Sequence, residues 1–454
     1  MRTFDYVAMM VGAVLIGGAC SDSYTPTPSA SGVFPSEGFI GRTLRVEISG
    51  EETKWATGAT VSFGDGITVS NVVVASESDI LADIDIPAST TLADRDVTVT
   101  SGKETDVLKG AFRLKSPIEL AFQGQAAQGS VAQFTVTNHD FDAPFDTTST
   151  GDGFFTPITY TNIQLDGGPG VALSVSNVTP YSISGLALID VDAPAMTPAI
   201  QVVSGPAGGT QVTSSLGSSL PIAARTPTVL ASDTPATGMV AMPFDSALYS
   251  FTPGGFPSLA QLSVAGNGPN GATGIAVLPS SGHFADLLAA GSSTDQLVRS
   301  GNLYVITYDL SGDAGYSYQL KGHGVALTTA ADSEPANNSS TTATMLTTAA
   351  SLVDNATLAD LNDEDWFAVT VPVGKKIHVI TLPGDPGTDT LVDIYGPNNA
   401  TTLFGSESSD SDFHEDLTSP AATVAGTYYV KISASQAGYF DPAHNAYLAV
   451  VTLE

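Results

Sequence analysis

Residues 61–74, VSFGDGITVSNVVV, decide the fold of the first part of the chain. Val61 and Phe63 alternate with polar residues, a Gly-Asp-Gly turn follows, and Ile67 and Val69 resume the alternation. Successive side chains of a strand point to opposite faces, so this pattern predicts two strands, each with one buried face, on either side of a tight turn.

The same alternation recurs along much of the chain, for example at Ala82, Ile84 and Ile86 with Asp83 and Asp85 between them. The 45 glycines and 27 prolines supply many turns, and stripes of apolar residues at helical spacing are scarce. We therefore predict an all-β protein of tandem antiparallel β-sandwich domains.

The predicted first domain, residues 33–115, resembles bacterial immunoglobulin-like modules of the IPT/TIG kind. The resemblance is carried by FPSEGFIG (34–41), by residues 61–74 and by RDVTVTSG (95–102). It implies a spacer or binding domain, because such modules share no catalytic residues.

Residues 116–226 are expected to form a second β-sandwich, of unknown family. AQFTVTN (132–138), VALSV (171–175) and ISGLALIDV (183–191) read as strands. The polar insertion at 140–155, DFDAPFDTTSTGDGFF, is open to two interpretations, a binding loop on a rigid scaffold or a solvated acidic loop.

Residues 228–327 and 334–454 read as two copies of one design. The second copy contains NDEDWFAVTV (362–371) and GTYYVKISAS (426–435), and it resembles the bacterial pre-peptidase C-terminal (PPC) domain. The resemblance implies a β-sandwich of the kind found beside the catalytic units of secreted proteases and in many surface proteins. The first copy is degenerate and lacks the paired acids, which indicates structural duplication.

The single cysteine, Cys20, follows an arginine at position 2 and the uncharged run 7–19. This is the layout of a signal peptide, and a lone thiol directly after small residues resembles the acylation point of a bacterial lipoprotein. We expect residues 1–20 to be a signal peptide with a lipobox-like end, Cys20 to carry lipid, and residues 21–32 to be a flexible tether. Cleavage nearby with an incidental Cys20 is the alternative.

These features predict an exported protein of the cell envelope, at the outer membrane or cell surface, attached to the membrane through its lipid only. A run of 13 apolar residues is too short to cross a bilayer, which needs about 20. The chain has 46 acidic and 15 basic residues, a net charge of −31, which argues against nucleic acid and anionic membrane surfaces as partners.

The PPC resemblance also implies calcium, because relatives attached to collagenases bind it through acids and amides at the domain entrance and through acids before an aromatic strand. The matching residues are Glu334, Asn337, Asn338, Asp363 and Asp365. These residue types offer the hard oxygen ligands that Ca²⁺ takes. A solvated acidic surface is the alternative for so acidic a chain.

Catalytic motifs are missing from the sequence. None of the six histidines lies in an H-E-x-x-H pattern, and there is no G-x-S-x-G elbow or phosphate-binding G-x-x-x-x-G-K-[ST] loop. Tyr428 and Tyr429 are candidate binding residues; because consecutive strand residues alternate, one of the two is expected in the core.

We predict a non-catalytic envelope lipoprotein that acts in surface binding, adhesion or presentation, with an extracellular or envelope protein or polysaccharide as its partner. The alternative is an accessory or remnant component of a secreted protease system that keeps the PPC domains. An enzyme in its own right would have to use residues 116–226.

Overall fold

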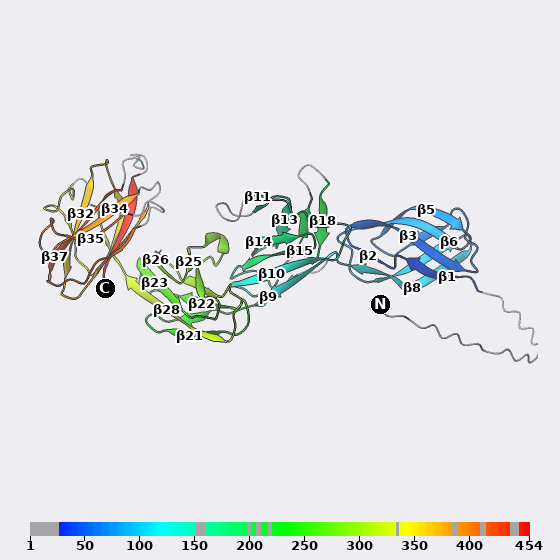
Figure 1. Ribbon diagram of the computed structural model, residues 1–454, viewed down its shortest axis with the longest axis horizontal. Helices are drawn as coiled ribbons and strands as arrows, with labels where there is room; N and C mark the ends of the chain where they lie inside the picture. Colours follow the sequence, from blue (N-terminus) through cyan, green and yellow to red (C-terminus); the bar gives the residue numbers. More distant parts are fainter. Residues whose placement is uncertain are drawn as a thin grey trace, which may run out of the picture. The chain divides into compact units, whose positions relative to one another are not determined.

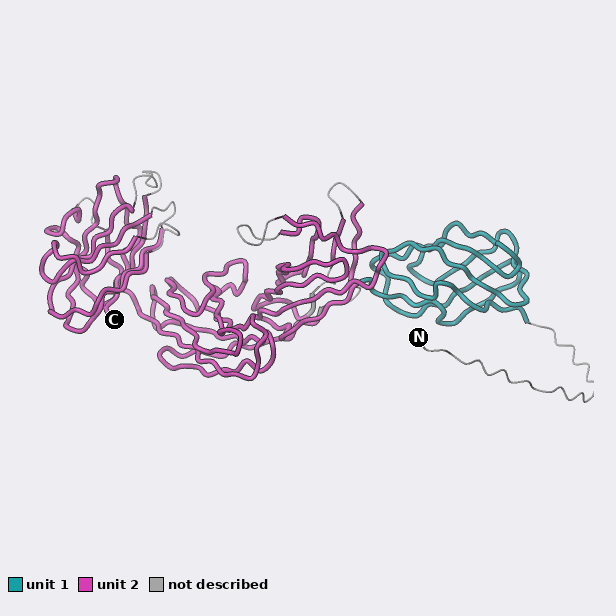
Figure 2. Tube along the Cα trace, viewed as in Figure 1, with its two compact units in different colours: residues 1–117 teal, residues 118–454 magenta. Residues whose placement is uncertain are grey.

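The computed structural model describes residues 27–150, 159–197, 201–205, 210–216, 220–332, 336–383, 389–408, 415–435 and 445–454. The all-β prediction is confirmed, since strands make up every element of this part of the chain except the 3-10 turn Phe284–Asp286 (Figure 1). The chain divides into two compact units, residues 1–117 and 118–454 (Figure 2). None of the described residues forms a helix long and apolar enough to span a membrane.

Unit 1 contains one two-sheet sandwich, here called module 1. Its sheets have the strand orders β1-β3-β6-β5 and β2-β8-β7-β4. The strands are β1 (Ser29–Phe34), β2 (Glu37–Phe39), β3 (Arg42–Glu51), β4 (Thr60–Ser62), β5 (Thr68–Ser76), β6 (Asp79–Ile86), β7 (Asp94–Ser101) and β8 (Glu104–Lys115). The alternating residues of β6 and β7 fill the core together with Trp55, Phe63 and Phe112.

The turn at 64–66 connects the two sheets of module 1. β4 before the turn pairs with β7, whereas β5 after it pairs with β6. Gly64 and Gly66 have φ angles of 79° and 84°, in the left-handed region that glycine enters without steric cost. The two glycines therefore let the chain cross from one sheet to the other within the five residues between Ser62 and Thr68.

Unit 2 begins with module 2, residues 118–223. A four-stranded sheet, β14-β15-β10-β9, packs with a three-stranded sheet, β13-β17-β18, and two short strand pairs, β11-β12 and β16-β19, accompany them. The strands are β9 (Ile118–Gln123), β10 (Ser130–Asn138), β11 (Ser149–Thr150), β12 (Thr159–Tyr160), β13 (Ile163–Asp166), β14 (Val171–Thr179), β15 (Ser182–Ile189), β16 (Met196–Thr197), β17 (Gln201–Ser204), β18 (Val212–Ser215) and β19 (Leu220–Pro221). The predicted insertion is described as far as residue 150, and Phe145 anchors this part in the core.

Module 3, residues 228–326, has the strand orders β20-β22-β27-β24-β25 and β21-β28-β23-β26. Its strands are β20 (Thr228–Leu230), β21 (Ala236–Val240), β22 (Ser246–Phe251), β23 (Ser258–Ala265), β24 (Gly274–Leu278), β25 (Ala289–Gly291), β26 (Ser293–Val298), β27 (Leu303–Tyr308) and β28 (Tyr316–Ala326).

Module 4, residues 328–453, has the orders β30-β32-β37-β34-β35 and β29-β31-β38-β33-β36. Its strands are β29 (Thr328–Ala330), β30 (Thr344–Leu346), β31 (Ala350–Thr357), β32 (Glu364–Val371), β33 (Ile377–Pro383), β34 (Thr390–Tyr395), β35 (Leu403–Glu407), β36 (Glu415–Thr418), β37 (Gly426–Ala434) and β38 (Ala446–Leu453).

Modules 3 and 4 have the same topology. Aligned in chain order, β20–β28 match β30–β38 strand for strand in both sheets, and β29 is an added edge strand of module 4. In both modules the first pair of the first sheet, β20-β22 or β30-β32, is parallel, and the remaining pairs of that sheet are antiparallel. This shared order is what a duplicated unit would have.

Apolar side chains join the modules of unit 2. Val131 and Leu186 of module 2 cluster with Leu248, Leu278 and Ile306 on the outer face of the β22-β27-β24 sheet of module 3. A second cluster, between modules 3 and 4, comprises Leu259, Leu327, Leu352, Ile380 and Val450. Each fully buried leucine or isoleucine contributes about 1.5–3 kcal/mol, so both contacts favour docked modules.

Candidate functional site

Two predicted site residues, Cys20 and Glu334, lie outside the described residues. The lipidation of Cys20 therefore stays a prediction. The other residues of the calcium prediction, together with Tyr428 and Tyr429, are described, and they fall into two sites of module 4: an acidic network at its entrance and an aromatic face on its first sheet.

The centre of the acidic network is Asp365 in β32, which is fully buried. Its Oδ2 accepts a hydrogen bond of 2.6 Å from the hydroxyl of Tyr447 in β38, and its Oδ1 accepts one of 3.1 Å from Nδ2 of Asn337. The same Nδ2 donates to Oδ1 of Asp332 at 3.0 Å. The carboxylate of Asp365 thus points into the module. Asn337 of the entrance segment and Tyr447 of the last strand donate hydrogen bonds to it.

Asn338 and Asp363 form a neighbouring pair. Nδ2 of Asn338 donates to Oδ1 of Asp363 at 2.6 Å, and the backbone N–H groups of Ala359 and Glu364 also donate to that carboxylate. Asp363 is 5% exposed. The structure therefore brings the four described residues of the prediction together as two adjacent amide–carboxylate contacts, and it adds Asp332 and Tyr447.

One atom of this network has no partner. Oδ1 of Asn337 is buried and accepts no hydrogen bond from any described residue, which is costly for a buried acceptor. Rotation of the amide by 180° exchanges its oxygen and nitrogen, so that Oδ1 lies toward the carboxylates of Asp332 and Asp365. Three hard oxygens of the kind that Ca²⁺ takes would then converge, which is fewer than the six to eight ligands of a complete site.

Tyr428 and Tyr429 point to opposite sides of the first sheet of module 4. Tyr428 is 1% exposed, its ring packs on Phe404, and its hydroxyl donates to the carbonyl of Val424 at 3.0 Å. Tyr428 is thus a core residue and offers no ring to a ligand, whereas Tyr429 lies on the outer side of β37. One of the two was expected in the core, and the apolar pattern of Tyr428, Val430 and Ile432 was the signal that identifies it.

The outer side of this sheet carries a row of opposed side chains that includes Tyr429. Tyr429 is opposite Ala368 of β32 and Tyr395 of β34, and these are opposite Met345 and Leu403 on the outer strands. Met345 is 50% and Leu403 57% exposed. Directly opposed residues share one face of a sheet, so the five form an apolar row across all five strands.

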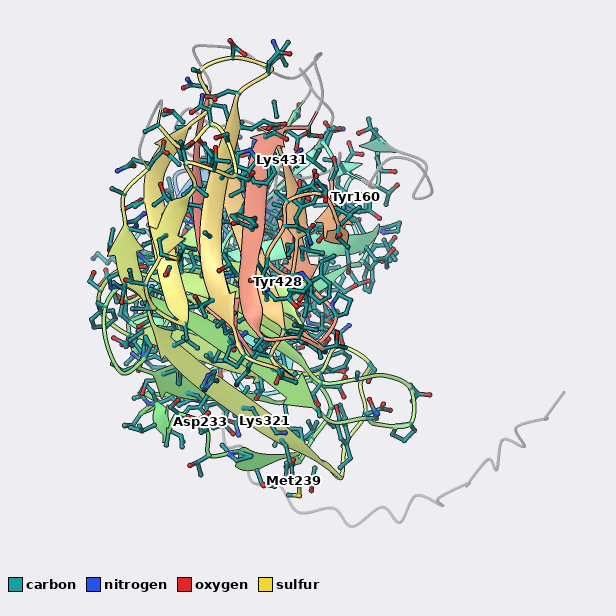
Figure 3. All side chains as sticks on the ribbon, turned by 90° about the vertical axis from the view of Figure 1, so that its left-hand side faces the viewer. Tyr160, Asp233, Met239, Lys321, Tyr428 and Lys431 are labelled. Carbon is teal, nitrogen blue, oxygen red and sulfur yellow. The ribbon has the colours of Figure 1, made fainter. Side chains whose placement is uncertain are left out.

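A second row, beside the first, mixes aromatic and charged groups. Trp366 is opposite Lys431, Lys431 is opposite Asp393, and Asp393 is opposite Ser406. The Trp366 ring stacks on Tyr395 with centroids 5.4 Å apart and meets Tyr429 edge-on at 6.5 Å. The two rows together are called the aromatic face below; Lys431 lies on it in Figure 3.

One lysine and two carboxylates meet at the aromatic face. Nζ of Lys431 lies 2.9 Å from Asp393 and 3.5 Å from Glu364, and Nε1 of Trp366 donates to Glu364 at 3.1 Å. Burial alone would lower the pKa of Lys431, but the hydrogen bond and charge of Asp393 outweigh it and raise that pKa. Burial, and then the charge of Asp393, raise the pKa of Tyr395. Lys431 is therefore cationic and neutralised at every physiological pH.

The corresponding face of module 3 is covered. Its sheet β20-β22-β27-β24-β25 matches the sheet of the aromatic face, and Leu248, Ile306 and Leu278 lie on its outer side in contact with module 2. In module 4 the matching strands carry Trp366, Lys431 and Tyr395 instead. The same sheet face is thus apolar and covered in module 3, and it carries aromatic and charged side chains in module 4.

Module 3 has a shallow pocket of about 370 Å³ on its other sheet, whose lining includes Asp233, Gln261, Asp295, Lys321 and His323. His323 contacts Asp233 at 2.5 Å, which lowers the pKa of that exposed carboxyl. Asp233 and Lys321 are labelled in Figure 3. The pocket lining contains no phenylalanine, tyrosine or tryptophan.

Among the described residues, one group of three His, Cys, Asp or Glu side chains lies close enough together to hold a metal ion: Asp190, Asp192 and His283. His283 lies 3.3 Å from Asp192, and this hydrogen bond raises its pKa. The side chains of Asp192 and His283 are 69% and 44% exposed, so water already solvates both.

No protein-family model matches the chain, and no curated protein matches it. Solved structures that align with it include tripeptidyl peptidase 2, with 11% identity and a TM-score of 0.19 over 74% of this chain; the chain spans about a third (33%) of that protein. The surface glycan-binding protein PbSGBP-B from Prevotella bryantii aligns over 66% of this chain and 99% of its own, and the ICAM-5 D1–D4 ectodomain over 88% and 100%, each with 10% identity and a TM-score of 0.17. Such low scores carry no functional inference, and the IPT/TIG and PPC resemblances stay predictions.

Proposed function

We propose that this protein is a non-catalytic, exported lipoprotein of the cell envelope that binds an extracellular polysaccharide on the aromatic face of module 4. The observation that carries the proposal is the face itself: aromatic and apolar side chains cross all five strands of a sheet whose counterpart in module 3 is a docking surface. Cys20 would anchor the chain through lipid, and residues 21–32 would hold the modules away from the membrane.

The chemistry of the face favours a neutral, hydroxyl-rich polymer. Aromatic rings present flat apolar surfaces with a polar rim, which suits the alternating C–H and O–H groups of a sugar ring. Asp393, Glu364 and Lys431 add acceptors and donors for hydroxyl groups. Because Lys431 is already neutralised and the chain carries a net charge of −31, an anionic polymer would be repelled.

We further propose that calcium binds the acidic network, with Asp332, Asn337 and Asp365 as ligands and Asp363, Asn338 and Glu334 beside them. An ion that binds only the folded state stabilises it by mass action. The network joins the entrance segment to β32 and β38, so calcium would fix the start of module 4 to the sandwich that bears the aromatic face.

Binding is tested with the chain carrying Cys20→Ser, on a panel of soluble and insoluble neutral polysaccharides, anionic polysaccharides and extracellular proteins. We expect retention on at least one neutral polysaccharide and at least about a tenfold loss of affinity in Tyr429→Ala, since truncation of a central aromatic anchor typically costs 2 kcal/mol or more. Tyr181→Ala removes an exposed tyrosine of module 2 and is the matched control.

Three outcomes contradict the proposal. Retention that Tyr429→Ala and Tyr395→Ala leave unchanged would place binding elsewhere. Binding to a protein and to no polysaccharide would make the face a protein-docking surface. A hydrolase that co-purifies with the wild-type chain, with no polymer bound, would favour the accessory component of a secreted protease system.

A further inference from the structure

The contact between modules 3 and 4 contains a histidine surrounded by carboxylates. His378 lies in β33 on the face that also bears Ile380, which packs in the apolar cluster between these modules. Its side chain is 5% exposed. A histidine buried in a module contact is unusual enough to need a physical reason, because burial favours the neutral ring.

Three carboxylates from three different strands or strand ends face this ring. Nε2 lies 2.7 Å from Oδ1 of Asp416 in β36, and Nδ1 lies 3.1 Å from Oε1 of Glu454, which follows β38. Asp295 of β26 approaches from module 3, with Oδ2 4.0 Å from Nε2. Nε2 is hydrogen-bonded to Asp416, whereas Nδ1 lies near Glu454 without a hydrogen bond of good geometry. The carboxylates on both sides of the ring favour the imidazolium by their charge.

The surroundings connect this cluster across the two modules. Nε2 of Gln261, in β23 of module 3, donates to Asp295 at 3.2 Å and to Glu454 at 3.4 Å. On the neighbouring strand β28, His323 lies opposite Gln261 and is paired with Asp233. Asp416, Glu454 and Asp295 are therefore the charged groups that act on His378 from the strands packed around it.

We propose that His378 is a proton-operated clasp between modules 3 and 4: its imidazolium holds the carboxylate of Asp295 across the contact, and loss of its proton loosens the joint. The neutral ring would no longer offset the repulsion of Asp295 by Asp416 and Glu454. The bidentate pair of Arg299 with Asp354, at 2.6 and 2.7 Å, and the apolar cluster do not titrate in the same range. This ion pair and the apolar cluster would keep the modules associated while the part of the contact that contains His378 opens.

The sign of the pH dependence follows from the surroundings. Burial lowers the pKa of His378, but the hydrogen bond to Asp416 and the charges of Asp416, Glu454 and Asp295 outweigh it, so the pKa is raised above 6.5. Burial, with the like charges of Asp416 and Glu454, also raises the pKa of Asp295. A group with a raised pKa stabilises the closed form fully below its unperturbed pKa and loses this effect as the pH rises through the raised value. The joint should therefore close at mildly acidic pH and loosen above neutrality.

The experiment measures the distance between the modules in the full chain. Dyes are attached to cysteines at Leu310→Cys and Val424→Cys, two exposed positions of modules 3 and 4, in a Cys20→Ser background. We expect constant energy transfer at low pH and a transition centred above pH 6.5. Each pH unit between 6.5 and the midpoint corresponds to about a tenfold change in the closing equilibrium.

Variants separate the clasp from other titrations. His378→Gln should show the open-state signal with no transition between pH 6 and 9, whereas His323→Gln, which removes an exposed histidine–carboxylate pair, should keep the wild-type transition. By NMR, Asp295→Asn should lower the pKa of His378, because one of the charges that favour the imidazolium is gone.

A wild-type chain without a transition, an equal transition in His378→Gln, or a His378 pKa that Asp295→Asn leaves unchanged would each overturn the clasp. If His378→Gln fails to fold, the Asp295→Asn measurement still decides, because that substitution lies in the other module.

Discussion

Removal of one hydroxyl group tests whether the acidic network stabilises module 4. In Tyr447→Phe the ring remains in the core, and the bond from the hydroxyl to Asp365 is lost. That bond measures 2.6 Å, and both residues are fully buried. A hydrogen bond to a charged group contributes about 1.5–3 kcal/mol, and burial places this one toward the upper part of that range.

The two tryptophans of the chain allow the effect to be measured in the intact protein. Trp55 lies in module 1 and Trp366 in module 4. In a Trp55→Phe background, Trp366 fluorescence reports the unfolding of module 4 alone. With a urea m-value of about 2 kcal/mol per M, a loss of about 2 kcal/mol lowers the midpoint by about 1 M.

Tyr429→Phe is the matched control, because it removes a tyrosine hydroxyl on the outer face of the same module. Surface changes of this kind stay within about 0.5 kcal/mol. Equal midpoints for Tyr447→Phe and Tyr429→Phe would refute the reasoning, since the buried hydroxyl would then contribute no more than an exposed one.

Other predictions concern the anchor, the metal, the module contact and catalysis. In cells, a fatty-acid probe should label the wild-type protein and should not label the Cys20→Ser variant. Equal labelling of the two proteins excludes lipid at this residue. Calcium should raise the urea midpoint reported by Trp366 over that in chelator, and Asp365→Asn should abolish the rise; coincident curves for the wild type mean that the network is purely structural. Leu248→Ala should destabilise the contact of modules 2 and 3 by about 2–4 kcal/mol in thermal melts, and a loss below 1 kcal/mol would show that the contact is not tightly packed. The purified chain should hydrolyse neither casein, gelatin, polysaccharides nor esters; turnover that disappears on a single substitution within residues 116–226 would make it an enzyme.

Alternation was sufficient to predict the fold class because each strand buries its own apolar residues. The segment DILADIDI at 79–86 reads as a strand without knowledge of its neighbours, and in the structure it is β6, with Ile80, Ala82, Ile84 and Ile86 buried. The sequence pattern did not predict which strands belong to the same sheet. The turn at 64–66 looks like a hairpin turn, yet β4 and β5 join different sheets, since sheet membership depends on partners far away in the sequence.

The candidate sites, like the sheets, could be predicted only in part from the sequence. Asn337, Asn338, Asp363 and Asp365 could be grouped in advance through a family resemblance, whereas Tyr447 and Asp332 join them only through folding. Tyr428 and Tyr429 were candidates for an exposed aromatic face from the sequence. The stacking of Trp366 on Tyr395 could not be predicted, because it is set by the register of β32, β37 and β34. The proposed clasp at His378 depends on the contact between modules 3 and 4, and no local sequence pattern predicts that contact.

The two copies of the duplicated sandwich differ in what they do with one sheet face, and this difference supports binding as the role of module 4. A permanent contact between modules favours apolar side chains, and module 3 supplies Leu248, Leu278 and Ile306 where it meets module 2. Interfaces that form and dissociate are instead enriched in aromatic residues such as tyrosine. Tyr395 and Tyr429, which are partly exposed on the matching strands of module 4, have that character. The inner copy is thus suited to hold its neighbour, and the outer copy to bind and release a ligand.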